Sequence, residues 1–199
     1  MSLARGRHAG HSRCWPWPRR CFATRRRPSL PHRRPQVFRP EAARHTANSD
    51  QLLDAYAAAA TTMAPATSLT VGVTWRDMVS GLTDTGRRWE KAGVAWSATG
   101  AVAASVIAPY LSSVNVVEVY VGAKTIAGLE AVAAEAELRP IAGGRLTLRP
   151  FPTVTARRLA SEMAGVHVAP WPRVYVDLRT FGVRGEEAAE HLLEVIRGR

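Results

Sequence analysis

Apolar residues recur at helical spacing in five segments of this 199-residue chain. In residues 49–64, Ser49 is expected to cap the helix, with Leu52, Leu53 and Tyr56 on one side. The same spacing predicts further helices over residues 77–93, 101–111, 124–137 and 185–199.

Alternating apolar and polar residues predict the strands. The clearest is the valine-rich run 115–122. Residues 138–141 and 144–150, on either side of Gly143, predict a hairpin. Shorter strands are predicted over residues 68–75, 94–100 and 166–169.

The closing part of the pattern is ambiguous over residues 171–182. Pro172 suits the first turn of a helix, whereas Val-Tyr-Val favours a strand, and we favour the helix. Strands and helices thus alternate, which predicts an α/β (α+β) domain over residues 48–199, with helices packed on a mixed sheet. Residues 92–117 carry no charge, but their polar residues and Pro109 favour a buried strand–helix–strand over a membrane span.

Charge divides the chain near residue 47. Residues 1–47 hold twelve arginines and one acid, Glu41, so they account for the whole net charge of +11. Residues 48–199 hold fifteen basic and fifteen acidic residues. The basic character therefore indicates nothing about what the folded domain binds.

The segment 1–47 is expected to be a disordered Arg/Pro-rich tail, because proline interrupts every apolar run. It lacks the amphipathic pattern of a transit peptide and the apolar run of a secretory signal. Cys14 and Cys21 are too far apart for a usual zinc site, so no metal is expected. A basic arm that binds nucleic-acid phosphates stays open, and it would use Arg19, Arg20, Arg25, Arg26, Arg27, Arg33 and Arg34. The composition favours the interpretation that residues 1–47 come from a misassigned or frame-shifted start and replace a genuine N-terminal domain.

The predicted strand–turn–helix–strand of residues 94–121 has the opening layout of the nucleotidyltransferase fold. In that fold two carboxylates on the second strand hold magnesium. Here Glu118 stands alone, followed by Val119 and Tyr120. We therefore expect a degenerate, inactive layout without a cofactor, in which Gly100 serves a turn that requires positive φ.

Charged residues also gather around residues 177–187. These residues are Asp177, Arg179, Arg184, Glu186 and Glu187, and with His167 and His191 they could form an acid/base cluster. We favour a structural salt bridge between Asp177 and Arg184, with Gly182 letting the chain turn between the last two helices. His191 is expected to be solvated or capping.

Four segments carry a resemblance that covers residues 49–199. They are "SDQLLDAYAAA" (49–59), "SATGAVAASVIAPYL" (97–111), "VEVYV" (117–121) and "VHVAPWPRVYVDLRTFGVRGEEAAEHLLE" (166–194). In this order they resemble the C-terminal domain of the AbiEi family, the antitoxin and transcriptional-regulator half of type IV toxin–antitoxin systems. The positions that match the family pattern include Gly100, Ala103, Pro109, Tyr175, Asp177, Leu178, Arg184, Glu187, Ala188 and Leu192.

The resemblance implies a cytoplasmic, non-enzymatic regulator that takes part in phage defence by abortive infection. Its functional partner would be a nucleotidyltransferase-like toxin, neutralised without a stable complex. Family members bind the operon promoter DNA through an N-terminal winged helix-turn-helix, which we expect this chain to lack because the arginine tail stands there. Two alternatives stay open: a nucleotidyltransferase-like or nuclease-like enzyme acting on nucleic acid, and a DNA-binding module that uses only the basic arm.

Overall fold

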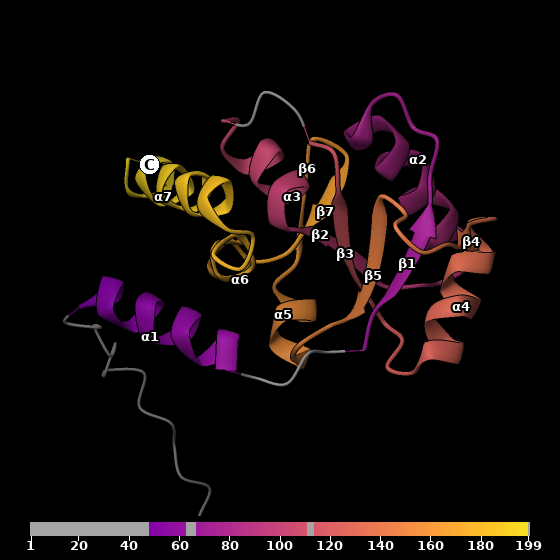
Figure 1. Ribbon diagram of the computed structural model, residues 1–199, viewed down its shortest axis with the longest axis horizontal. Coiled ribbons are helices and arrows are strands. Elements are labelled where there is room, and N and C mark those ends of the chain that lie inside the picture. Colours follow the sequence, from indigo (N-terminus) through magenta and orange to yellow (C-terminus); the bar gives the residue numbers. More distant parts are fainter. Residues whose placement is uncertain (1–47, 63–66, 111–113, 199) are drawn as a thin grey trace, which may run out of the picture. The chain divides into compact units, whose positions relative to one another are not determined.

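A seven-stranded sheet forms the centre of the computed structural model, which describes residues 48–62, 67–110 and 114–198 (Figure 1). Parallel pairing joins β3 to β5 and β2 to β7, and the other four neighbouring pairs are antiparallel. The predicted α/β fold with a mixed sheet is therefore confirmed. In spatial order the strands are β4 (Arg139–Pro140), β1 (Leu69–Gly72), β5 (Leu146–Pro150), β3 (Val117–Val121), β2 (Trp96–Thr99), β7 (Val166–Val168) and β6 (Ser161–Met163).

Helices cover both faces of the sheet (Figure 1). On one face α3, α6 and α7 contact one another and α1 contacts α6, while α2 and α4 pack together on the other face. The helices are α1 (Ser49–Thr62), α2 (Met78–Lys91), α3 (Gly100–Ile107), α4 (Ile126–Glu135), α5 (Val154–Arg158), α6 (Trp171–Leu178) and α7 (Val183–Arg197).

Side-chain caps fix where four of the helices begin. Asn48 caps α1, since its Oδ1 accepts a hydrogen bond from the Gln51 amide at 3.1 Å, so the expected cap Ser49 is instead the first helical residue. The side-chain oxygen of Asp77 accepts a hydrogen bond from the Ser80 amide at 2.7 Å, and Thr125 and Thr153 do the same at α4 and α5. Such caps satisfy amides that have no partner inside the helix. Helix α6 instead carries Pro172 in its first turn, which resolves the ambiguous segment in favour of the helix.

The core lies between the sheet and its two helical layers. Trp89 of α2 is fully buried, and its indole Nε1–H donates to the Val132 carbonyl of α4 at 2.8 Å. Leu82 and Leu129 fill the same layer, while Val102 and Leu192 are fully buried on the opposite side. The buried side chains of α3 and α7 thus hold the α3–α6–α7 layer against the sheet, where α3 contacts β2 and β3 and α6 contacts β2.

The predicted hairpin over residues 138–150 is wrong. β4 and β5 do not pair, because β1 lies between them: Val71 is opposite Pro140 on one side and Leu146 on the other. Gly144 permits this arrangement, since a Cβ there would meet the Val71 carbonyl oxygen at 2.2 Å. The glycines between residues 141 and 145 indicate that the chain turns there, but they do not indicate which strand pairs with β5.

The predicted apolar side of the first helix is also partly wrong. Leu53 and Ala57 face the core, whereas Leu52 is 59% exposed. The inward face thus follows the i, i+4 spacing rather than the adjacent leucines. The sequence patterns also gave no prediction of the short elements α5 and β6.

The uncharged run 92–117 is divided as expected, into β2, α3 and the beginning of β3. Across the described ranges, every helix is too short or too polar to reach from one side of a membrane to the other. The two ends of the sheet are formed by short strands, β4 with two residues and β6 with three.

Candidate functional site

Asp177 on α6 is the centre of a buried hydrogen-bond network. Its side chain is 2% exposed, and its Oδ2 accepts hydrogen bonds from the Thr99 hydroxyl at 2.5 Å and the Tyr120 hydroxyl at 2.6 Å. Its Oδ1 accepts from Nη2 of Arg173 at 2.6 Å. The end of β2, the middle of β3 and α6 are therefore joined through one carboxylate.

Arg173 extends the network outward. Its Nε donates to the Tyr120 hydroxyl at 2.9 Å, and its Nη1 donates to the Tyr56 hydroxyl of α1 at 3.5 Å. Burial acts to lower the pKa of Arg173, but the charge of Asp177 and these hydrogen bonds outweigh it, so the pKa is raised. Burial, followed by the charge of Asp177, also raises the pKa of Tyr120. The guanidinium and the phenol thus keep their protons.

The expected salt bridge between Asp177 and Arg184 is not formed. The partner of Asp177 is Arg173, one helical turn earlier, because positions i and i+4 share a face of α6. Gly182 does turn the chain between α6 and α7, with φ of +70°. Arg184 lies in the first turn of α7, where its side chain is exposed, and it has no ion-pair partner among the described residues.

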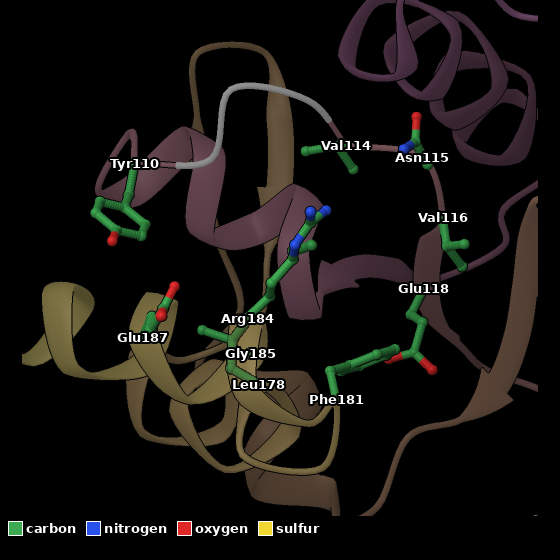
Figure 2. A pocket seen from close by; sticks show the side chains of 11 residues that line it. Tyr110, Val114, Asn115, Val116, Glu118, Leu178, Phe181, Arg184, Gly185 and Glu187 are labelled. Carbon is green, nitrogen blue, oxygen red and sulfur yellow. The ribbon is translucent and has the colours of Figure 1, made fainter.

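A pocket of about 600 Å³ opens beside this network (Figure 2). It lies between α3, α7 and the segment that leads into β3. Its lining residues are Ala101, Tyr110, Val114, Asn115, Val116, Glu118, Leu178, Phe181, Arg184, Gly185 and Glu187.

Glu118 is the most buried acid of this pocket, with 13% of its side chain exposed. Its Oε1 accepts a hydrogen bond from Nη1 of Arg149 at 3.3 Å, whereas its buried Oε2 has no hydrogen-bond partner among the described residues. Burial raises the pKa of Glu118; Arg149 opposes the shift, and the nearby charge of Asp177 adds to it. This carboxyl group therefore ionises less readily than an ordinary glutamate.

Gly100 stands where the network and the pocket meet. Its φ is +59°, as the turn hypothesis predicted, so a side chain would be strained there. A Cβ at this position would lie 3.2 Å from Glu118 Oε2 and 3.4 Å from the Phe181 ring. The carboxylate and the ring therefore both approach the first turn of α3.

The remaining predicted residues have separate surroundings. Tyr175 is buried, receives a hydrogen bond from Arg179 at 3.1 Å and donates to Asp54 of α1 at 3.5 Å. His191 is partly buried and stacks on Tyr110 with ring centroids 4.8 Å apart. Glu187 is exposed at the pocket rim.

His167 belongs to another group and contacts Glu90 at 3.2 Å, so it does not join Asp177 in an acid/base cluster. In the described ranges no three His, Cys, Asp or Glu side chains come together as metal ligands would. The tail arginines and both cysteines lie outside the described residues.

Sequence reasoning missed Thr99, Tyr120 and Arg173 as partners of Asp177. One signal was present for Arg173: its spacing of four residues from Asp177 on an amphipathic helix. Thr99 and Tyr120 lie 78 and 57 residues away from Asp177 and carry no local signal.

The raised pKa of Glu118 predicts a pH effect on stability. Because the folded state holds this proton more tightly than the unfolded chain, stability should fall as the pH rises from 4.5 through the folded-state pKa. Glu118→Gln cannot titrate, so its stability relative to wild type should increase across that window. Urea unfolding of both proteins from pH 4 to 8 measures this difference. Glu130→Gln, an exposed change on α4, should follow the wild type; a pH-independent difference for Glu118→Gln would contradict the assignment.

Scans of this chain against protein-family models, curated proteins and solved structures found no match.

Proposed function

We propose that residues 48–199 form the non-enzymatic regulatory domain of an antitoxin of the AbiEi type. Its functional partner would be a nucleotidyltransferase-like toxin of a type IV toxin–antitoxin system, in the cytoplasm. The family's promoter-binding winged helix is not found within the described ranges, so binding of DNA stays a prediction that concerns the arginine tail.

The observation that carries this proposal is the meeting of the four resembling segments at Asp177. Thr99 comes from the second segment, Tyr120 from the third and Asp177 from the fourth. The first segment joins through Tyr56, which accepts from Arg173. Short apolar motifs are weak evidence one at a time, but one buried network gives a single physical reason for all four to occur together.

The state of the acids supports a non-enzymatic role. Both oxygens of Asp177 are occupied by donors from Thr99, Tyr120 and Arg173, so this carboxylate is not free to take a proton from a substrate. Glu118 is held on one side by Arg149. A carboxylate fixed by three protein donors serves to join elements of the fold.

The second candidate function is a nucleotidyltransferase-like enzyme. One observation favours it: the β2–α3–β3 layout places Glu118 close enough to Asp177 for their charges to interact. In that case the purified chain would transfer nucleotides from nucleoside triphosphates to a nucleic acid in the presence of magnesium, with release of pyrophosphate, and Glu118→Gln would abolish the transfer.

Co-expression tests the regulatory proposal. The nucleotidyltransferase-like protein of the same operon and the full chain are placed under separate inducible promoters, and growth is measured. We expect growth arrest by the first protein alone and recovery when the chain is present. Arg87→Ala, which removes only an exposed ion pair on α2, should keep the recovery. Persistent arrest despite a soluble, folded chain would refute the proposal.

A further inference from the structure

A second pocket, of about 390 Å³, lies beyond the end of β3, whereas the pocket of Figure 2 lies beside its beginning. β3 and β5 are parallel and end in register, since Val121 is opposite Pro150 and each is the last residue of its strand. The volume lies within the range of about 300–1,000 Å³ that is common for ligand pockets. Its lining residues are Val121, Gly122, Ala123, Lys124, Phe151, Pro152, Thr153, Val154 and Arg157.

The chain leaves these two strands in opposite directions. From β3 it passes β5 to reach α4 and β4 at one end of the sheet, and from β5 it passes β3 to reach α5 and β6 at the other end. Figure 1 shows α4 to the right of β5 and α5 to its left. Two such connections do not cross on one face, so they run on opposite faces of the sheet. Where neighbouring parallel strands connect to opposite faces, a crevice opens beyond their carboxyl ends, and open α/β sheets bind ligands in such crevices.

The charges of this pocket favour an anion. Its described lining holds two cations, Lys124 from the loop after β3 and Arg157 from α5, and no acid. Both side chains are exposed, and neither forms an ion pair with another described residue. A guanidinium binds two phosphate oxygens at once and an ammonium binds them as a point charge, so the two groups together suit a phosphate.

The rest of the pocket is apolar. Phe151 is partly buried and stacks on Tyr120 with ring centroids 5.9 Å apart, so the core holds its ring in place. Pro152 is exposed and Val154 is 74% exposed beside it. A phosphate ion alone would leave this wall uncovered, whereas a phosphate attached to a flat apolar ring would cover it. Every nucleobase offers such a face, and bases stack on aromatic side chains.

We propose that this pocket binds a nucleotide, with its phosphate held by Lys124 and Arg157 and its base lying against Phe151, Pro152 and Val154. The nucleotide can be free in solution or part of a nucleic-acid strand, since both present a phosphate close to a base. The site shares no lining residue with the pocket of Figure 2 and does not depend on the antitoxin role.

The test uses the full chain, labelled with ¹⁵N, and three probes: adenosine 5′-monophosphate, neutral adenosine and inorganic phosphate. We expect adenosine 5′-monophosphate to cause saturable shifts of the Gly122, Ala123 and Phe151 amides. The other two probes should bind at least about tenfold more weakly, because each lacks one half of the ligand. Added salt should weaken the binding, since it screens exposed charges. The position of the shifted amides separates this pocket from phosphate binding by the arginine tail.

Variants of the two cations test the contact with the phosphate. Lys124→Ala and Arg157→Ala should each weaken binding of adenosine 5′-monophosphate by roughly three- to tenfold, and the double variant by more. Phe151→Leu, which keeps both cations, should weaken it several-fold. The matched control is the double variant Arg87→Ala/Lys91→Ala, which removes two exposed cations of α2 and should bind like the wild type.

A further arm separates the two sources. The dinucleotide ApA carries only the internal phosphate diester of a strand, so the tighter binder of ApA and adenosine 5′-monophosphate identifies the source. The proposal is overturned if adenosine or inorganic phosphate binds as tightly as adenosine 5′-monophosphate, if the folded double variant of Lys124 and Arg157 binds with unchanged affinity, or if no pocket amide shifts. Should that double variant fail to fold, unchanged affinities of both single variants overturn it equally.

Discussion

Replacing Asp177 by alanine should lower the free energy of unfolding by about 3–5 kcal/mol, because it breaks a buried ion pair and leaves Arg173 charged and unpaired. The hydroxyls of Thr99 and Tyr120 lose their acceptor in the same step. For a domain of this size the thermal midpoint should fall by roughly 10 °C or more. Thermal and urea unfolding, followed by circular dichroism, measure both quantities.

A double-mutant cycle separates the network from the loss of a single side chain. Arg173→Met should also destabilise, and the double mutant should cost less than the sum of the two single changes. The control is Asp84→Ala, which removes an exposed pair with Arg87 and should change stability by about 0–1 kcal/mol. Equal, small effects of Asp177→Ala and Asp84→Ala would show that the network contributes nothing.

The second large effect is expected on the opposite face of the sheet. Trp89→Ala should lower the free energy of unfolding by about 3–5 kcal/mol, because it empties a fully buried site between α2 and α4. It also removes the indole N–H that donates a hydrogen bond to the Val132 carbonyl at 2.8 Å. The measurement is urea unfolding at constant pH.

Trp89→Phe divides this effect into its two parts. Phenylalanine retains much of the buried volume but has no N–H, so the Val132 carbonyl remains unsatisfied. Trp89→Phe should therefore lower the free energy of unfolding, but by less than Trp89→Ala does. If Trp89→Phe were as destabilising as Trp89→Ala, the hydrogen bond rather than the packing would dominate at this position.

Local patterns were sufficient for the long, regular elements. Valine alternation located β3, and helical spacing located α2, α4 and α7, because their buried faces must repeat with the period of the structure. Pro172 was the decisive local signal for α6. The hairpin prediction failed for a different reason: β1 enters between β4 and β5 from more than sixty residues earlier, and no local signal reports such an insertion.

The same distinction applies to the candidate site. The sequence indicated that Gly100 needs positive φ and that Asp177 is held by an arginine, but it placed the wrong arginine there. The choice between Arg173 and Arg184 depends on whether residues 171–178 are helical, because only a helix brings Arg173 and Asp177 onto one face. Glu118 Oε2, which has no partner in the part of the chain that the structure describes, is buried by several elements at once, and such burial has no sequence signature.

The short strands at the two ends of the sheet bear on how the domain resists aggregation. An exposed sheet edge is a template on which another chain can add a strand, and long flat edges allow fibrils to grow. Here β4 offers two residues, one of them Pro140 without an N–H, and β6 offers three, including exposed Glu162. The longest strands of the sheet, β3 and β5, are paired with a neighbouring strand on both sides. The domain thereby keeps the valine-rich strand β3 out of reach of neighbouring molecules for as long as it stays folded.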